Sequence, residues 1–137
     1  MGRMYHIDIA VFAAEADTRW VDNLVSAHRI PGVESSRRGV ARRMSTHAIY
    51  HIAIVRQLSQ GFGASVDTAV DLANRLLGAD DSRISIPGHL EVRVDRQNFE
   101  RAIDERIAVA VESIVPARRG RPIGAKSRAL AASRRLE

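Results

Sequence analysis

The sequence predicts an α+β fold that is mostly helical, with a small β-hairpin and a long C-terminal helix. Four segments with apolar residues at helical spacing each follow an aspartate or a serine that suits a helix N-cap. Two short alternating segments flank Pro87-Gly88, which is typical of a hairpin. The length of 137 residues fits one domain with short appendages.

The N-terminal part of the chain is predicted to hold a strand, a helix and an irregular basic loop. Residues 5–12 alternate weakly and are rich in Ile and Val, which predicts a short strand. Asp17 offers an N-cap for a helix over residues 19–30, and Pro31 ends that helix. Residues 34–43 are polar and contain two pairs of arginines, so we expect no regular element there.

Two further helices are predicted in the middle of the chain. Ser45 caps a helix over residues 46–60 whose middle is apolar nearly all round, so this helix is expected to be central to the core. Ser65 caps an amphipathic helix over residues 66–77, which a glycine follows.

The C-terminal part is predicted to form a hairpin from residues 83–86 and 89–94, followed by a helix over residues 96–115. Asp95 caps this helix and Pro116 ends it. Its apolar stripe either packs back on the same chain or pairs with a second subunit, and we expect a homodimer. The residues expected at that interface are Phe99, Ile103, Ile107, Ala110, Val111 and Ile114.

The composition excludes several classes of function. The chain has no cysteine, which rules out disulfides, thiolate metal sites and thiol nucleophiles. Aromatic residues make up only 4%, so we expect no deep aromatic cofactor pocket and no cofactor. No apolar stretch reaches the length of a membrane span, and the N-terminal residues lack an apolar signal core, so we expect a cytoplasmic protein without a membrane partner.

The charge is concentrated in the C-terminal tail. Residues 116–137 hold seven basic side chains and one acid, whereas residues 1–115 hold 14 basic and 15 acidic side chains. A near-neutral body with a strongly basic tail is typical of a chain that contacts a polyanion.

Residues 18–77 carry a resemblance to a known family, and the closest stretch is 42–77. Arg42-Arg43-Met44-Ser45 leads into an apolar helix, and a glycine break and a further short helix follow. This order resembles the mercury-resistance-regulator (MerR) type of winged-helix DNA-binding domain. The resemblance implies a winged-helix-like core and double-stranded DNA as the partner. In that family two helices precede the wing, whereas here only one is predicted, with residues 13–16 standing where the other should be.

The resemblance also implies which residues contact DNA. Those facing the groove would be Thr18, Arg19, Asp22 and Asn23, and those of the wing would be Arg37, Arg38, Arg42 and Arg43. Independently of the family, two arginine pairs that flank Gly39 repel each other unless a polyanion or an acidic partner accepts them. The alternatives are a solvated basic loop and a surface helix packed through Trp20 and Leu24.

The tail contains a short motif that resembles an AT-hook. The motif is Arg-Gly-Arg-Pro with basic neighbours, and the residues expected to contact DNA are Arg118, Arg119, Gly120, Arg121, Pro122 and Lys126. A glycine lets the backbone lie flat in a narrow groove, and proline fixes the extended direction. The arginines then follow the negative potential of an A·T minor groove. The alternative is an ordinary solubilising tail.

His47 and His51 are the main candidates for chemistry. They are spaced i, i+4 on a predicted helix, which can hold a metal, but no third ligand is evident and a structural pair is favoured. We therefore expect neither a metal site nor an enzyme.

The leading hypothesis is a double-stranded DNA-binding protein, a dimeric and nucleoid-associated bacterial transcription regulator. The alternatives are an antitoxin-type autorepressor whose tail binds a protein partner, and a small metal enzyme that uses the two histidines. The predicted organisation is a winged-helix-like domain over residues 1–78, a hairpin and dimerisation helix over 79–115, and a flexible AT-hook-like tail over 116–137.

Truncation after Val115 tests the tail. We expect the full chain to prefer a DNA site flanked by A·T tracts over the same site flanked by G·C tracts, because the guanine amino group occupies the floor of the minor groove. The truncated chain should lose this preference in a fluorescence-anisotropy titration. If truncation lowers the affinity equally for both kinds of flank, the tail acts only as diffuse positive charge. If truncation leaves the affinity unchanged, a protein partner for the tail is favoured.

Overall fold

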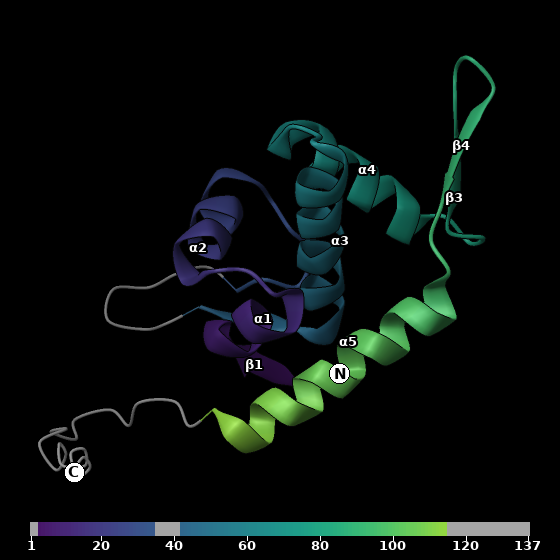
Figure 1. The fold of residues 1–137 in the computed structure, drawn as a ribbon. Helices are drawn as coiled ribbons and strands as arrows, with labels where there is room; N and C mark the ends of the chain where they lie inside the picture. The colour runs from purple at the N-terminus through teal and green to yellow at the C-terminus, as the bar shows by residue number, and fades with distance from the viewer. Residues whose placement is uncertain (1–2, 35–41, 115–137) are drawn as a thin grey trace, which may run out of the picture.

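A computed structural model of the chain describes residues 3–34 and 42–114. Within these residues the fold is α+β and mostly helical, with five helices and two two-stranded antiparallel sheets (Figure 1). The predicted fold class is confirmed. Arg37 and Arg38 of the expected wing lie outside the described residues, as do the expected tail contacts from Arg118 to Lys126.

The strand predicted over residues 5–12 is wrong for most of its length. Strand β1 covers only Met4–His6, and helix α1 follows at once over Ile7–Ala14. The N–H of Asp8 donates to Nδ1 of His6 over 3.1 Å, so the histidine side chain serves as the N-cap. Ile and Val suit a strand as well as a helix, but the buried residues of α1 recur at helical spacing. This spacing favours the helix. The buried residues are Ile7, Ile9, Ala10, Ala13 and Ala14.

Helix α2 covers Thr18–Ala27 and is capped by Asp17, as predicted, with the N–H of Trp20 donating to Oδ1 of Asp17 over 2.7 Å. It ends earlier than the predicted residue 30, because His28 already has an extended backbone. Its buried face also differs from the one predicted through Trp20 and Leu24. Val21, Leu24 and Val25 are buried, whereas Trp20 is half-buried.

Strand β2 covers Arg43–Ser45 and pairs with β1 in antiparallel register, with Tyr5 opposite Met44. The sequence prediction assigned no strand here. The pairing fixes the chain that follows α2, because Gly32 accepts a hydrogen bond from the N–H of Ser45 over 3.0 Å. Gly32 has φ +92°, and a side chain at this position would collide with Ser45 and Ala48. The close approach therefore requires glycine.

Helices α3 (Thr46–Phe62) and α4 (Val66–Gly78) agree with the predicted positions and with the predicted caps Ser45 and Ser65. Eight consecutive residues of α3, Ala48 to Val55, are buried. The prediction of a helix central to the core is thus confirmed.

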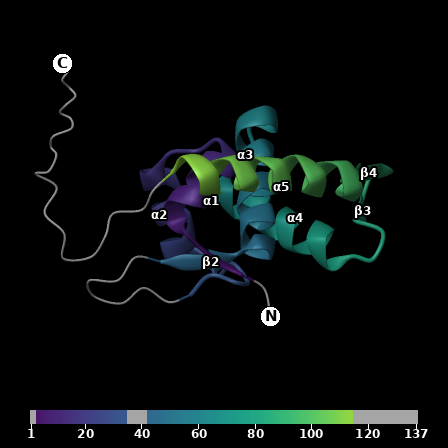
Figure 2. The same cartoon turned by 90° about the horizontal axis from the view of Figure 1, so that it is seen from below.

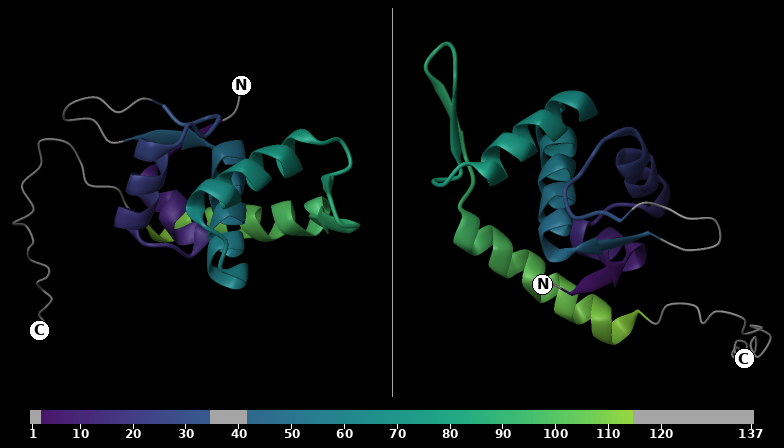
Figure 3. Two further views of the ribbon diagram at one scale, coloured as in Figure 1. Left: turned by 90° about the horizontal axis from the view of Figure 1, so that it is seen from above. Right: turned by 180° about the vertical axis from the view of Figure 1, so that it is seen from behind.

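Strands β3 (Arg83–Ile86) and β4 (Leu90–Arg93) form the predicted hairpin, with Ile84 opposite Val92. The turn between them uses positive φ at Gly88 and His89. The hairpin projects from one end of the molecule and α2 lies at the other end (Figures 1 and 3).

Helix α5 covers Arg96–Ser113, is capped by Asp95, and lies across α1 and α3 (Figure 2). Three of the six residues expected at a dimer interface follow the alternative of packing on the same chain. Ile103, Ile107 and Ala110 are buried within the same chain, and they belong to one core cluster with α3. Phe99 and Ile114 are packed against that cluster, and Val111 is 36% exposed.

Among the residues that the structure describes, no helix combines the length and the apolar character needed to cross a membrane.

Ile103→Ala tests the intrachain packing of α5. We expect the free energy of unfolding to fall by about 2–5 kcal/mol, because the truncation leaves a cavity in a closed core. Val109→Ala on the exposed side of the same helix should cost about 0.5 kcal/mol. The measurement is urea unfolding at two protein concentrations. A loss that grows on dilution would instead place Ile103 at an interface between chains.

Candidate nucleic-acid interface

Helices α1 and α2 are joined by a three-residue turn, and they pack against each other. Glu15 ends α1 in the left-handed region with φ 56°, and Asp17 begins α2 as its cap. Ala10 and Ala13 of α1 are fully buried in the core. The turn and this packing fix the direction in which α2 presents its outer face.

That outer face is polar and exposed. The structure brings the four α2 residues that the sequence prediction named together on this face, and it adds Ser26. The exposed residues are Thr18, Arg19, Asp22, Asn23 and Ser26. At 3.6 residues per turn they span about 140° of the helix circumference. We call these five residues the α2 polar face.

Arg42 lies against the α2 polar face. Its Nε is 3.4 Å from Oδ1 of Asp22, and its Nη2 donates to Oγ of Ser26 over 2.9 Å. The side chain of Arg42 is only 18% exposed. The neighbouring Arg43 is exposed on β2, opposite His6. The two described arginines of the expected wing therefore have different surroundings.

A second contact holds α2 to the core helix. The guanidinium of Arg56 on α3 stacks over the Trp20 ring, 5.0 Å from its centroid. This contact explains why Trp20 is half-buried at the edge of α2 instead of forming the centre of its buried face. Sequence reasoning missed the contact, and it also missed Ser26. The spacing of Ser26 from Asp22, one helical turn, was the only available signal.

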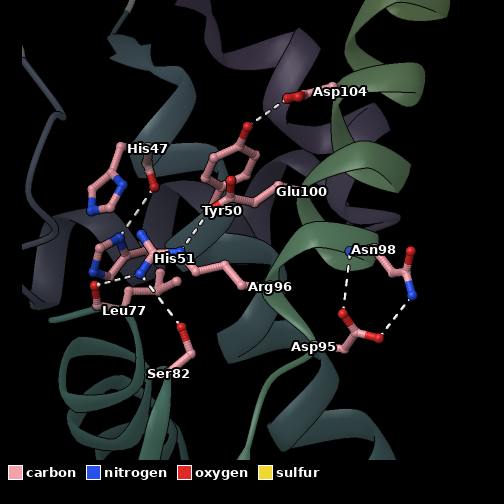
Figure 4. Close-up of polar contacts among 10 residues, drawn as sticks. All are labelled: His47, Tyr50, His51, Leu77, Ser82, Asp95, Arg96, Asn98, Glu100 and Asp104. Atoms are coloured by element: carbon pink, nitrogen blue, oxygen red, sulfur yellow. Dashed lines mark hydrogen bonds and ion pairs between the residues drawn. The ribbon is translucent and has the colours of Figure 1, made fainter. Parts of the chain in front are cut away.

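His47 and His51 form a structural pair. His51 is buried, and its Nδ1 donates to the carbonyl of His47 over 3.1 Å (Figure 4). Burial lowers the pKa of the His51 imidazole below its ordinary value, although the bond to the His47 carbonyl opposes this shift. Within residues 3–34 and 42–114, no group of three or more metal-ligating side chains occurs.

The other polar contacts near this pair also join elements of the fold. Arg96 donates to the carbonyl of Leu77 over 3.3 Å and pairs with Glu100 over 2.8 Å (Figure 4). The hydroxyl of Tyr50 donates to Asp104 over 2.6 Å, and burial together with this carboxylate raises the pKa of Tyr50. These contacts fasten α5 to α3 and α4.

Comparisons with protein-family models, with curated proteins and with solved structures found no match.

Acidification tests the burial of His51. Because its pKa is lowered in the folded state, the unfolded chain binds the proton more tightly. The stability is therefore fully present above the ordinary pKa of 6.5 and is lost as the pH falls below it, with a slope of at most about 1.4 kcal/mol per pH unit. We expect His51→Gln to weaken this dependence in urea unfolding between pH 7 and pH 5, and His47→Gln to retain it. Equal slopes for the native chain and His51→Gln would contradict this account.

Proposed function

We propose that this chain binds double-stranded DNA by placing α2 in the major groove, and that it acts as a dimeric transcription regulator. The observation that carries the proposal is the α2 polar face, which is exposed on the second of two helices joined by a tight turn. In helix-turn-helix proteins the second helix enters the major groove and presents its side chains to the base edges.

The presence of α1 supports the proposal. The sequence prediction had only one helix before the expected wing, whereas the winged-helix family has two. The described fold has α1, a turn and α2 in this place, with β2 after α2 and its partner strand β1 before α1. The presence of two helices before the expected wing therefore supports the proposal, because the sequence prediction had supplied only one.

The side-chain types of the α2 polar face support the same function. Arginine hydrogen-bonds guanine and asparagine hydrogen-bonds adenine, and hydroxyl groups bond to bases or phosphates. Arg19 and Asn23 supply the first two groups, and Thr18 supplies a hydroxyl at the start of the helix.

The dimer remains a prediction. Because Ile103, Ile107 and Ala110 are covered by their own chain, a second subunit would have to use other apolar groups. Phe12, Phe62 and Val109 are exposed by 41%, 83% and 50%, and they are available for such a contact. The roles of the tail and of Arg37 and Arg38 concern residues outside the described ranges, and they stay predictions from the sequence.

Selection from a pool of random duplexes, followed by titration of the selected site, tests this function. We expect Arg19→Ala to weaken binding by about 1–3 kcal/mol, because a lost base contact costs this much. Arg101→Ala removes the same charge from the exposed side of α5, so it is the matched control and should leave the affinity nearly unchanged. Failure to select any duplex, or equal losses for the two variants, would overturn the proposal.

A further inference from the structure

The α2 polar face consists of two adjacent rows that differ in their partners. Asp22 and Ser26 lie one turn apart, and both contact Arg42. Arg19 and Asn23 also lie one turn apart, on the neighbouring row, and their side chains make no hydrogen bond or ion pair with any residue that the structure describes. Within the part of the chain that the structure describes, Arg42 therefore engages one row, while the side chains of the other row make no polar contact.

We propose that Arg42 is a positioning residue that ties the start of β2 to α2, with Asp22 and Ser26 as its anchors, so that Arg19 and Asn23 read the bases. This inference rests on the proposed function. It replaces the expectation that Arg42 contacts phosphate and that Asp22 faces the groove as a reading residue.

The geometry of Arg42 fits a structural contact with α2 better than a contact with a DNA phosphate. Two atoms of its planar guanidinium engage two different side chains, and 82% of its side-chain surface is covered, since only 18% is exposed. The backbone beside Arg42 is also held in place. The backbone N–H of Glu34 donates to the carbonyl of Arg43 over 2.9 Å, and Val33 forms an isolated antiparallel β-bridge with Met44. Arg42 thus extends from a fixed strand end to α2.

The negative charge of Asp22 gives the contact between Arg42 and Asp22 a role in DNA binding. The carboxylate of this ion pair is exposed, and ion pairs with exposed partners contribute at most about 1 kcal/mol to stability. A carboxylate on a surface that meets a polyanion repels the phosphates unless a cation offsets its charge. Asp22 is 57% exposed on the α2 polar face, and Arg42 is the cation beside it.

The spacing of Arg19 and Asn23 also fits two base pairs that lie close together but are not adjacent. Residues four apart on a helix are about 6 Å apart along its axis, and base pairs stack at about 3.4 Å. Arg19 and Asn23 can therefore reach base pairs about two steps apart. Arginine pairs with O6 and N7 of guanine, and asparagine pairs with N6 and N7 of adenine. The recognised duplex should carry a guanine and an adenine within about two steps.

A double-mutant cycle on the selected duplex tests the fastening, with the variants Arg42→Ala, Asp22→Ala and both together. Arg42→Ala leaves the Asp22 charge uncompensated, so we expect this variant to bind the duplex more weakly than the native chain. The double variant should bind at least about threefold more tightly than Arg42→Ala alone. Arg43→Ala is the matched control, and its effect should simply add to that of Asp22→Ala. Thermal unfolding of each variant checks that the fold is kept.

Two further readouts separate a positioning role from a phosphate contact. Each phosphate contact contributes about 0.9 to the slope of log affinity against log salt concentration. If Arg42 makes no phosphate contact, Arg42→Ala should leave this slope nearly unchanged. In a repeated selection, Asp22→Ala should keep the preferred sequence, whereas Asn23→Ala should lose the preference for adenine at one position. Additive effects of Arg42→Ala and Asp22→Ala, or a changed sequence preference for Asp22→Ala, would overturn the inference. If the native chain selects no duplex, the proposed function itself fails.

Discussion

The burial of helix α3 is the constraint on which the rest of the molecule depends. Ala48 to Val55 have no exposed side, so the chain has to supply partners all around this helix. It does so with α1, α4, α5 and β2. The polar members of the run are satisfied within the same arrangement, because Tyr50 bonds to Asp104 and His51 bonds to the carbonyl of His47. Helix α2 is left outside this set and packs chiefly on α1. Its polar side therefore remains exposed.

Local signals in the sequence predicted most of the helices. Asp17, Ser45, Ser65 and Asp95 each bond to a backbone N–H in the first turn of the helix that follows, which is the interaction that makes these residue types informative. The segment from residue 5 to 12 escaped prediction because its cap is a histidine, and because Ile and Val suit a strand as well as a buried helix face. Strand β2 escaped because its partner β1 lies far away in the sequence.

The candidate site was predictable only in part, for a similar reason. The polar positions of α2 follow from the helix periodicity and from the family resemblance. The contact between Arg42 and α2 depends instead on how the chain returns through Gly32 and Met44, which no local pattern encodes. The stripe of α5 shows the same limit. Its spacing indicated that the face must be covered, but it did not indicate that α1 covers it.

The pairing of β1 with β2 has a consequence for the order of folding. Contacts between α3 and α4 join neighbours in the sequence, whereas β1 meets β2 only after the intervening α1–α2 segment has been placed. Closing a long loop costs entropy before the strand pair returns any energy. We therefore expect α3 and α4 to associate early, and the half that contains α2 to be fixed late and to open first in amide hydrogen exchange. A ligand that bound α2 would thus stabilise the whole protein through the part that is easiest to unfold.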